Sequence, residues 1–97
     1  MSQFAVIGLG QFGLAASLEL MRLGNSVVGV DLDPKLINGV SDKLTLSAVA
    51  DATDEHSLKE LDIASCDAVL VAIGDSLEAS ILCVLLLKSL NIKEIWV

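Results

Sequence analysis

Aromatic and basic side chains are scarce in this sequence. Its 97 residues include one tryptophan, two phenylalanines and no tyrosine, so we expect a core built from aliphatic side chains. Six basic residues stand against thirteen acidic ones, which leaves a net charge of −7, and the only arginine is Arg22. Because contacts with nucleic acid or an anionic membrane surface need clustered lysines and arginines, neither is expected as a partner. The apolar content of 54% excludes intrinsic disorder.

Residues that commonly carry catalysis or bind metals are also few. Cys66 and Cys83 belong to no CxxC motif or Cys/His cluster, so we expect buried, reduced thiols rather than a zinc site or a redox pair. His56 is the only histidine, and its place in the first turn of an expected surface helix indicates a solvated side chain. The sequence offers no recognisable Ser-His-acid set, metal-ligand cluster or pair of carboxylates with a positioned base.

The uncharged first part of the chain could be mistaken for a signal peptide or a membrane-spanning helix. Residues 1–18 carry no charged side chain. A signal peptide would begin with basic residues, and a spanning helix needs about 20 predominantly apolar residues. Polar residues and closely spaced glycines interrupt this segment, and the later apolar run at 81–87 is much too short. We therefore expect neither a signal peptide nor a membrane span.

Short apolar runs alternate with helical periodicity along the chain. Strands are expected at 4–8, 26–31, 44–50, 68–73 and 94–97, and helices at 12–23, 34–39, 55–61 and 77–90. This alternation predicts an α/β fold: a Rossmann-like, doubly wound parallel sheet of order 3-2-1-4-5 in three layers, α/β/α. The fourth run is the most apolar and should be central, and the third should lie nearer an edge. We expect residues 1–97 to form one domain, truncated before the sixth strand that such folds usually carry.

A glycine-rich turn is the clearest functional signal. Gly8, Gly10 and Gly13 match G-x-G-x-x-G between the first expected strand and the first expected helix, which is the context that this motif requires for dinucleotide binding. The glycines would permit a tight turn, close approach of the phosphates and close helix–strand packing. Asp31 ends the second strand, where a carboxylate can accept hydrogen bonds from the ribose hydroxyls. It would repel a 2′-phosphate, and no arginine is nearby in the sequence, so NADP is disfavoured. The alternative is that the glycines only form a tight turn between strand and helix and that Asp31 is a solvated loop residue.

Two further strand ends are expected at the same cleft, because ligands bind outside the carboxyl ends of parallel strands. Asp51 and the backbone of Ala52 follow the third strand and could meet the adenine edge. The alternative is a capping run for the next helix, with Thr53 or Asp54 as the N-cap. Ile73 and Gly74 end the fourth strand. Gly74 could pass close to the phosphates or could simply serve the turn.

The last helix is apolar on almost every side. From Ala79 to Leu90 the only charge is Lys88. A helix that lies on a sheet needs only one apolar stripe, so the excess indicates a second face covered by another subunit or by further chain. Deep burial within a single domain is the alternative.

Several stretches in combination resemble one known family. They are AVIGLGQFG at 5–13, DLD at 31–33, ADATDEHSLKELDI at 50–63, VAIGDSLEAS at 71–80 and LLLKSLNIKEIWV at 85–97. The chain is similar along essentially its whole length to the amino-terminal lobe of the RCK (KTN, TrkA-N) domain, which belongs to regulatory subunits of Trk/Ktr-type potassium uptake systems. The glycine motif is shared with many dehydrogenases, whereas the DAT segment and the AIG-x-x-x-x-AS stretch are more specific.

The resemblance implies a regulatory role and no enzymatic activity. It implies dimers and an octameric ring in the cytoplasm, docked beneath a membrane potassium-translocating subunit that the ring gates when its nucleotide is exchanged. ATP or ADP is the expected ligand, with NAD or NADH as the alternative. Carried onto this sequence, the phosphate loop comprises Gly8, Gly10, Gln11, Phe12 and Gly13, the ribose acid is Asp31, the adenine contacts are Asp51 and Ala52, and Ile73 and Gly74 flank the phosphates.

One position departs from the pattern of this family. Related sequences often carry arginine where this chain has Gln11, and that arginine can reach the terminal phosphate of ATP in a neighbouring subunit. Glutamine can donate a hydrogen bond there but brings no charge. Composition and spacing alone leave three functions open: a ligand-sensing regulatory module, the cofactor-binding half of an NAD-dependent dehydrogenase, and a structural assembly module.

Overall fold

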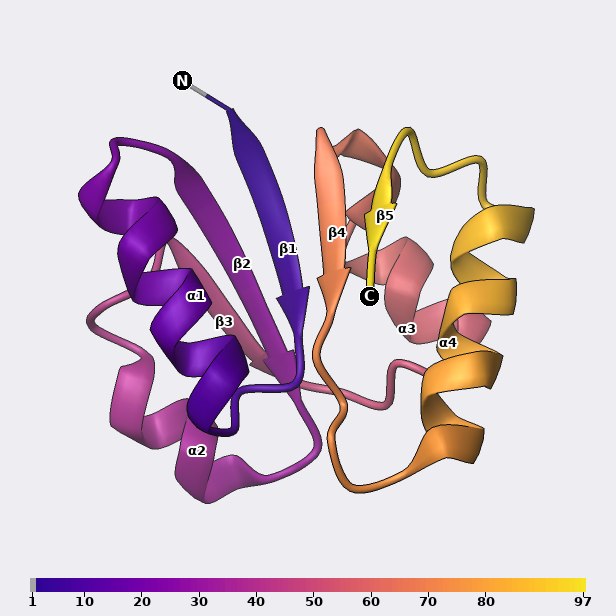
Figure 1. Cartoon of the computed structure of the whole chain (residues 1–97), viewed down its shortest axis with the longest axis horizontal. Coiled ribbons are helices and arrows are strands. Elements are labelled where there is room, and N and C mark those ends of the chain that lie inside the picture. The colour runs from indigo at the N-terminus through magenta and orange to yellow at the C-terminus, as the bar shows by residue number, and fades with distance from the viewer. Residues whose placement is uncertain (1) are drawn as a thin grey trace.

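The computed structural model describes residues 2–97. Its strands are β1 (Gln3–Ile7), β2 (Ser26–Asp31), β3 (Leu46–Val49), β4 (Ala68–Val71) and β5 (Ile95–Trp96), and its helices are α1 (Gln11–Arg22), α2 (Pro34–Val40), α3 (Glu55–Glu60), the short 3₁₀ helix η1 (Ile63–Ser65) and α4 (Leu77–Ser89). The five strands form one parallel sheet in the order β3-β2-β1-β4-β5 (Figure 1). This confirms the predicted strand order, the edge position of β3 and the interior position of β4.

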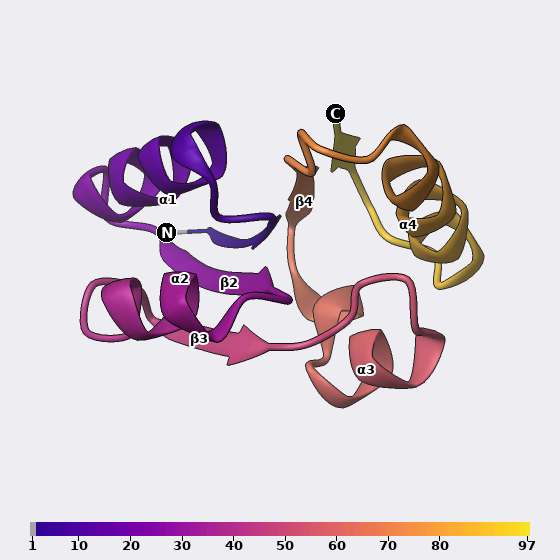
Figure 2. The ribbon, with the colours of Figure 1, turned by 90° about the horizontal axis from the view of Figure 1, so that it is seen from below.

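The sheet is covered on both faces, which explains why its central strands read as continuous apolar runs. Alternate side chains of a strand point to opposite faces, so Ile7 belongs to one buried cluster and Val6 to the other. The first cluster packs beneath α3 and α4, and the second packs beneath α1 and α2. Seen from below, α1 and α2 lie to the left of the twisted sheet and α3 and α4 to the right (Figure 2).

Side-chain caps explain where two of the helices begin. The carboxylate of Asp33 accepts a hydrogen bond from the backbone N–H of Lys35 at 2.9 Å, with proline at the first position of α2. Ser76 caps α4 by accepting from the N–H of Ala79 at 3.1 Å. Asp54 occupies the N-cap position of α3 but makes no side-chain bond to the helix backbone. Its carboxylate accepts from the Ser57 hydroxyl instead.

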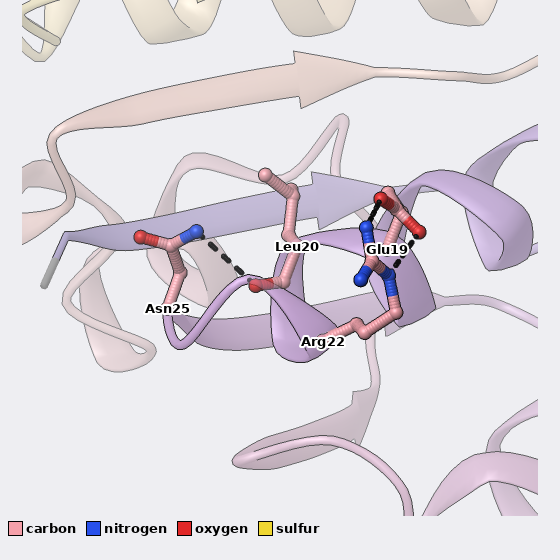
Figure 3. A network of polar contacts seen from close by, with 4 residues as sticks. All are labelled: Glu19, Leu20, Arg22 and Asn25. Atoms are coloured by element: carbon pink, nitrogen blue, oxygen red, sulfur yellow. Dashed lines mark hydrogen bonds and ion pairs between the residues drawn. The ribbon is translucent and has the colours of Figure 1, made fainter.

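The carboxyl end of α1 lies near the amino ends of the strands, at the opposite end of the sheet from the loops that follow the strands. There the side-chain amide of Asn25 donates to the carbonyl of Leu20 at 3.1 Å (Figure 3). Arg22, in the last turn of α1, forms an exposed ion pair with Glu19 (Figure 3). At 1.5 Å per residue, the only arginine stands about 16 Å along the helix from Gln11.

Most element boundaries lie within one residue of the prediction, and the larger differences are in β3 and β4. β3 begins at Leu46 rather than residue 44. Leu44 is buried in the core, and the Thr45 hydroxyl accepts a hydrogen bond from the backbone N–H of Val27 at 3.0 Å. β4 ends at Val71, two residues before the predicted end. The helix η1 was not predicted, since three residues are too few to show a period.

The last helix leaves much of its apolar surface uncovered by residues 2–97. α4 buries Cys83 and Leu87 against the sheet. Its outer residues Leu77, Ile81, Leu82 and Leu85 are all exposed. Deep burial on all sides, the alternative drawn from the sequence, is therefore wrong for this outer face. None of the helices in residues 2–97 combines the length and the apolar content needed to cross a bilayer.

Candidate functional site: a cleft at the carboxyl ends of the strands

The loops that follow β1, β2, β3 and β4 surround a cleft of about 830 Å³ at the carboxyl ends of the strands. In Figure 1 this is the end of the sheet to which the arrowheads point. The cleft is lined by Ile7, Gly8, Gly10, Val30, Asp31, Leu32, Asp33, Leu36, Ala50, Asp51, Ala52, Thr53, Ala72, Ile73, Gly74, Asp75, Ser76 and Ala79. Its position outside the strand ends matches the ligand crevice of open α/β sheets, and its volume suits a small-molecule ligand.

Two of the three motif glycines are required by close backbone packing. Gly8 has φ = +98°, and a Cβ atom there would lie 2.6 Å from the carbonyl oxygen of Ala72. A Cβ atom on Gly13 would overlap the carbonyl oxygen of Gly8. Gly10 differs, because nothing lies within 4 Å of a Cβ atom built on it. The absence of a side chain at Gly10 is thus not required by the packing of this chain, and it leaves the backbone open to the cleft.

The amino terminus of α1 lacks the partners that cap the other long helix. Its N-cap is Gly10, which has no side chain to offer, and its first turn contains no acidic residue. Within residues 2–97 the backbone N–H groups of Gln11, Phe12 and Gly13 have no hydrogen-bond acceptor. Three free N–H groups at the positive end of a helix dipole form a ready site for an anion.

Only two of the five residues expected in the phosphate loop line the cleft. Gly8 and Gly10 line the cleft, whereas Gln11, Phe12 and Gly13 do not. Gly13 is buried beneath the turn, and the Phe12 ring is 68% exposed. Any contact from these three residues to a ligand in the cleft would therefore come first from their backbone N–H groups.

Asp31 joins two loops at the cleft. One carboxylate oxygen, Oδ2, accepts from the backbone N–H of Leu9 in the glycine turn at 2.7 Å. The other, Oδ1, accepts from the N–H of Asp33 at 2.8 Å. The half-buried carboxylate therefore holds the glycine turn in place while lining the cleft. Each carboxylate oxygen has a further lone pair, so Asp31 can also accept hydrogen bonds from a diol.

Asp51 and Ala52 line the cleft from the end of β3. Asp51 accepts from both the hydroxyl and the backbone N–H of Thr53, at 2.6 and 2.9 Å. The hydroxyl bond, followed by the backbone bond, lowers the pKa of the Asp51 carboxyl. Asp51 thus forms a local turn with Thr53 before α3 while it lines the cleft, and the run anticipated as a cap makes no side-chain cap bond to that helix. Ala52 is buried and also belongs to the core.

The opposite wall comes from the segment between β4 and α4. Ile73 and Gly74 both line the cleft. The hydroxyl of Ser80 in α4 donates to the carbonyl of Ile73 at 2.9 Å, which fixes the segment against the helix. No atom lies within 4 Å of a Cβ atom on Gly74, so packing within this chain does not demand glycine there.

The lining also contains residues that were not predicted from the sequence, among them Leu32, Leu36 and Asp75. Leu32 and Leu36 bring apolar side chains to the cleft, and Asp75 adds a carboxylate next to Gly74. An available signal was the position of Leu32, a leucine between two aspartates directly after a strand, whose side chain is 66% exposed. Apolar side chains at a cleft edge are typical of sites that bind flat rings.

Other groups singled out in the sequence lie away from the cleft lining. His56 is exposed and pairs with Glu60 at 2.8 Å in α3. Cys66 and Cys83 are free and buried. Burial raises the pKa of both thiols, that of Cys83 to about 11, with the Asp51 carboxylate contributing at Cys83. Residues 2–97 bring together no group of three or more potential metal ligands among histidine, cysteine, aspartate and glutamate.

Comparison with protein families matches residues 4–97 to the TrkA-N domain. The chain belongs to the TrkA-N domain family. Ktr system potassium uptake protein A of Bacillus subtilis is 45% identical over 95 residues, and its counterpart in Vibrio alginolyticus is 40% identical, each match covering 98% of this chain. Ktr system potassium uptake protein C of B. subtilis is also 40% identical over 95 residues. The TrkA-N chain spans 43% of the length of each of these three relatives.

Two solved structures share the fold of the TrkA-N chain. The AMP-bound Kef CTD of Shewanella denitrificans superposes with a TM-score of 0.82 at 21% identity, covering 96% of this chain and 56% of that one. The NAD(P)-binding domain of an exopolyphosphatase-related protein from Archaeoglobus fulgidus gives a TM-score of 0.81 at 29% identity, covering 93% and 67%. The doubly wound Rossmann-like class predicted from the sequence is thereby confirmed.

Proposed function

We propose that residues 1–97 form one domain that binds an adenine nucleotide in the cleft. The observation that carries the proposal is that one cleft contains both a site for an anion and a carboxylate that can accept hydrogen bonds from a diol. The uncapped amino terminus of α1 offers three free N–H groups, and Asp31 lines the same cleft with its carboxylate held by the glycine turn. The AMP in the Kef structure and the NAD(P)-binding function of the A. fulgidus domain support this ligand class.

In this proposal each wall of the cleft recognises one part of the ligand. The phosphates lie against Gly8, Gly10 and the N–H groups of α1, and Asp31 accepts the ribose hydroxyls. The adenine lies by Asp51 and Ala52, with Leu32 and Leu36 against its faces. The segment that contains Ile73 and Gly74 flanks the phosphates on the other side. Gln11, Phe12 and Gly13 contribute their backbone N–H groups.

ATP or ADP is the proposed ligand, and NAD or NADH is the alternative. NADP is disfavoured, because its 2′-phosphate would meet the Asp31 carboxylate. The only arginine is held by Glu19 at the far end of α1 (Figure 3). A carboxylate at the ribose favours a free 2′-hydroxyl, whereas a 2′-phosphate needs an arginine nearby.

The wider role that we propose is regulation of potassium uptake. Similarity to Ktr system potassium uptake proteins A and C supports a subunit that acts with a membrane potassium-translocating partner from the cytoplasmic side. The exposed apolar face of α4 (Leu77, Ile81, Leu82 and Leu85) is a surface available for self-association into dimers and an octameric ring. Gating by a nucleotide requires that the ligand bind two arrangements of the subunits with different affinity.

Calorimetric titration of this chain with ATP, ADP, AMP, NAD and NADH tests the proposal. We expect binding of at least one adenine nucleotide, with ATP or ADP the tightest. Asp31→Ala should weaken it by about 1–3 kcal/mol through loss of charge-assisted hydrogen bonds. Asp42→Ala is the control, because Asp42 is an exposed acid outside the cleft lining. Because Asp31 also holds the glycine turn, urea unfolding of both variants must accompany the titrations.

A second variant separates the binding site from the fold. Gly10→Val adds a side chain where the packing of this chain leaves space, so the protein should fold and lose nucleotide binding. Retained affinity would exclude phosphate binding at the glycine turn. Failure of every nucleotide to bind the wild-type chain would overturn the proposed ligand class and favour a purely structural assembly module.

One alternative function has support from a relative of similar structure. The A. fulgidus domain is named for NAD(P) binding, which keeps open the cofactor half of an NAD-dependent dehydrogenase. That function predicts preferential binding of NAD or NADH and hydride transfer in a longer chain. Tight ATP or ADP binding with weak NAD binding would exclude it.

A further inference from the structure

The cleft proposed to bind a nucleotide is lined by acids alone among its charged residues. Asp31, Asp33, Asp51 and Asp75 line it, and none of the six basic residues of the chain does. Two of those bases are engaged elsewhere, Arg22 with Glu19 and Lys59 with Glu55. The attraction for phosphate therefore comes from neutral backbone N–H groups, while every full charge on the wall is negative.

Three of the four lining carboxylates accept hydrogen bonds that stabilise the local structure of the chain. Asp31 holds the glycine turn, Asp33 caps α2 and Asp51 binds Thr53. Among the residues that the structure describes, the carboxylate of Asp75 has no hydrogen-bond or ion-pair partner. Its charge is thus not offset by a donor, and nothing in the packing of α4 depends on it, since Ser76 supplies the cap.

Asp75 follows the strand that pairs with the one leading into the glycine turn. β1 and β4 are neighbours in the sheet, with Ile7 opposite Val71. The glycine turn and the segment containing Asp75 therefore leave adjacent strand ends, and both line the cleft (Figure 1). Asp31, by contrast, ends β2 and Asp51 follows β3, on the other half of the sheet.

We propose that Asp75 is a specificity-determining residue that sets how much phosphate charge the cleft accepts. This inference rests on the proposed nucleotide site. The free N–H groups of α1 bind a first phosphate whatever else the ligand carries, whereas repulsion from Asp75 grows with each added negative charge. Free ATP carries about two more negative charges than AMP at neutral pH. The charge of Asp75 therefore lowers the affinity for metal-free ATP more than it lowers the affinity for AMP.

Paired titrations of AMP and ATP test this proposal, in a chelator and at low ionic strength so that only free nucleotides are present. Asp75→Asn keeps the size of the side chain and removes its charge. We expect it to strengthen ATP binding by about three- to tenfold and AMP binding by less than about twofold, as estimated for charges a few ångströms apart in a solvated cleft. The difference should shrink at about 0.5 M salt, where screening is strong.

Glu78→Gln is the matched control. Glu78 is exposed in the first turn of α4, three residues from Asp75, and does not line the cleft. Both variants change the net charge by the same amount, so an effect of overall charge would appear in both. Equal changes for AMP and ATP in Asp75→Asn, no change, or an equal effect of Glu78→Gln would overturn the role of Asp75. If neither AMP nor ATP binds any variant, the nucleotide site itself is refuted, and the selectivity with it.

Discussion

Replacing Gly13 with alanine would place a methyl group on the carbonyl oxygen of Gly8 and within 2.9 Å of its carbonyl carbon. Both atoms are backbone, so no flexible side chain can move aside. The first turn of α1 would have to lift away from the glycine turn. The variant therefore tests whether α1 is seated on that turn as closely as the structure describes.

Two opposing effects set the expected magnitude. Alanine is favoured over glycine inside a helix by about 0.5–1 kcal/mol. Overpacking a tightly packed site costs about 1–3 kcal/mol and occasionally more, and contact between two backbone segments belongs at the upper end. We expect Gly13→Ala to lower the free energy of unfolding by about 2 kcal/mol net. Gly10→Ala has open space around its Cβ and should cost less than about 1 kcal/mol as an N-cap change.

Urea unfolding followed by far-ultraviolet circular dichroism measures both variants. For a small domain with an m-value of about 1–2 kcal/mol/M, a loss of 2 kcal/mol lowers the urea midpoint by about 1–2 M. Gly10→Ala should stay within about 1 M of the wild type on the same scale. Unfolding of Gly13→Ala at the wild-type midpoint, or equal destabilisation of the two variants, would show that α1 does not pack this closely on the glycine turn.

Three further predictions concern the core, the cleft and the last helix. Because burial is the main cause that raises the pKa of Cys83 to about 11, Ellman's reagent at about pH 8 should modify this thiol only after unfolding; rapid reaction of the native protein would contradict its burial. The lowered pKa of Asp51 means that this carboxyl stabilises the fold above its unfolded pKa, near 3.8, and that the contribution is lost as the pH falls through the lower folded value. An NMR titration should find the folded pKa below 3.8 and raised by Thr53→Val, and an unchanged value would exclude the Thr53 hydroxyl as the main cause. In α4, Leu87→Ala should cost about 2–5 kcal/mol because Leu87 is 0% exposed. Leu85→Gln should cost less than about 0.5 kcal/mol because Leu85 is 59% exposed, and similar losses in both would show that the helix faces the sheet differently.

Much of the fold was predictable because its signals are local. An apolar run followed by G-x-G-x-x-G indicates a strand, a turn and a helix within fourteen residues of the start, and Asp33 before Pro34 marks a helix start without reference to the rest of the chain. The strand order followed from the alternation of strands and helices together with the right-handed crossover rule. The boundary of β3 did not follow, because it depends on the Thr45 hydroxyl reaching Val27, eighteen residues away in sequence.

The candidate site divides in the same way. Gly8, Gly10 and Asp31 were predictable because their motif has a fixed spacing, and all three line the cleft. The bond from the Leu9 N–H to Asp31 was not predictable, since it needs two loops from different strands to meet. Leu32, Leu36 and Asp75 were missed for the same reason: nothing in their local sequence says that they face the same space as the glycine turn.

The amino-acid sequence alone therefore determined the class of the fold, the strand order and the position of the glycine turn, because period, capping and turn residues act over a few neighbours. Only the tertiary structure decided which side chains share the cleft. It also showed that Gly13 serves packing while Gly10 stays open, and that one face of α4 is left uncovered by residues 2–97. Those features depend on distances between segments far apart in the chain, and such distances exist only once the sheet has brought the strand ends together.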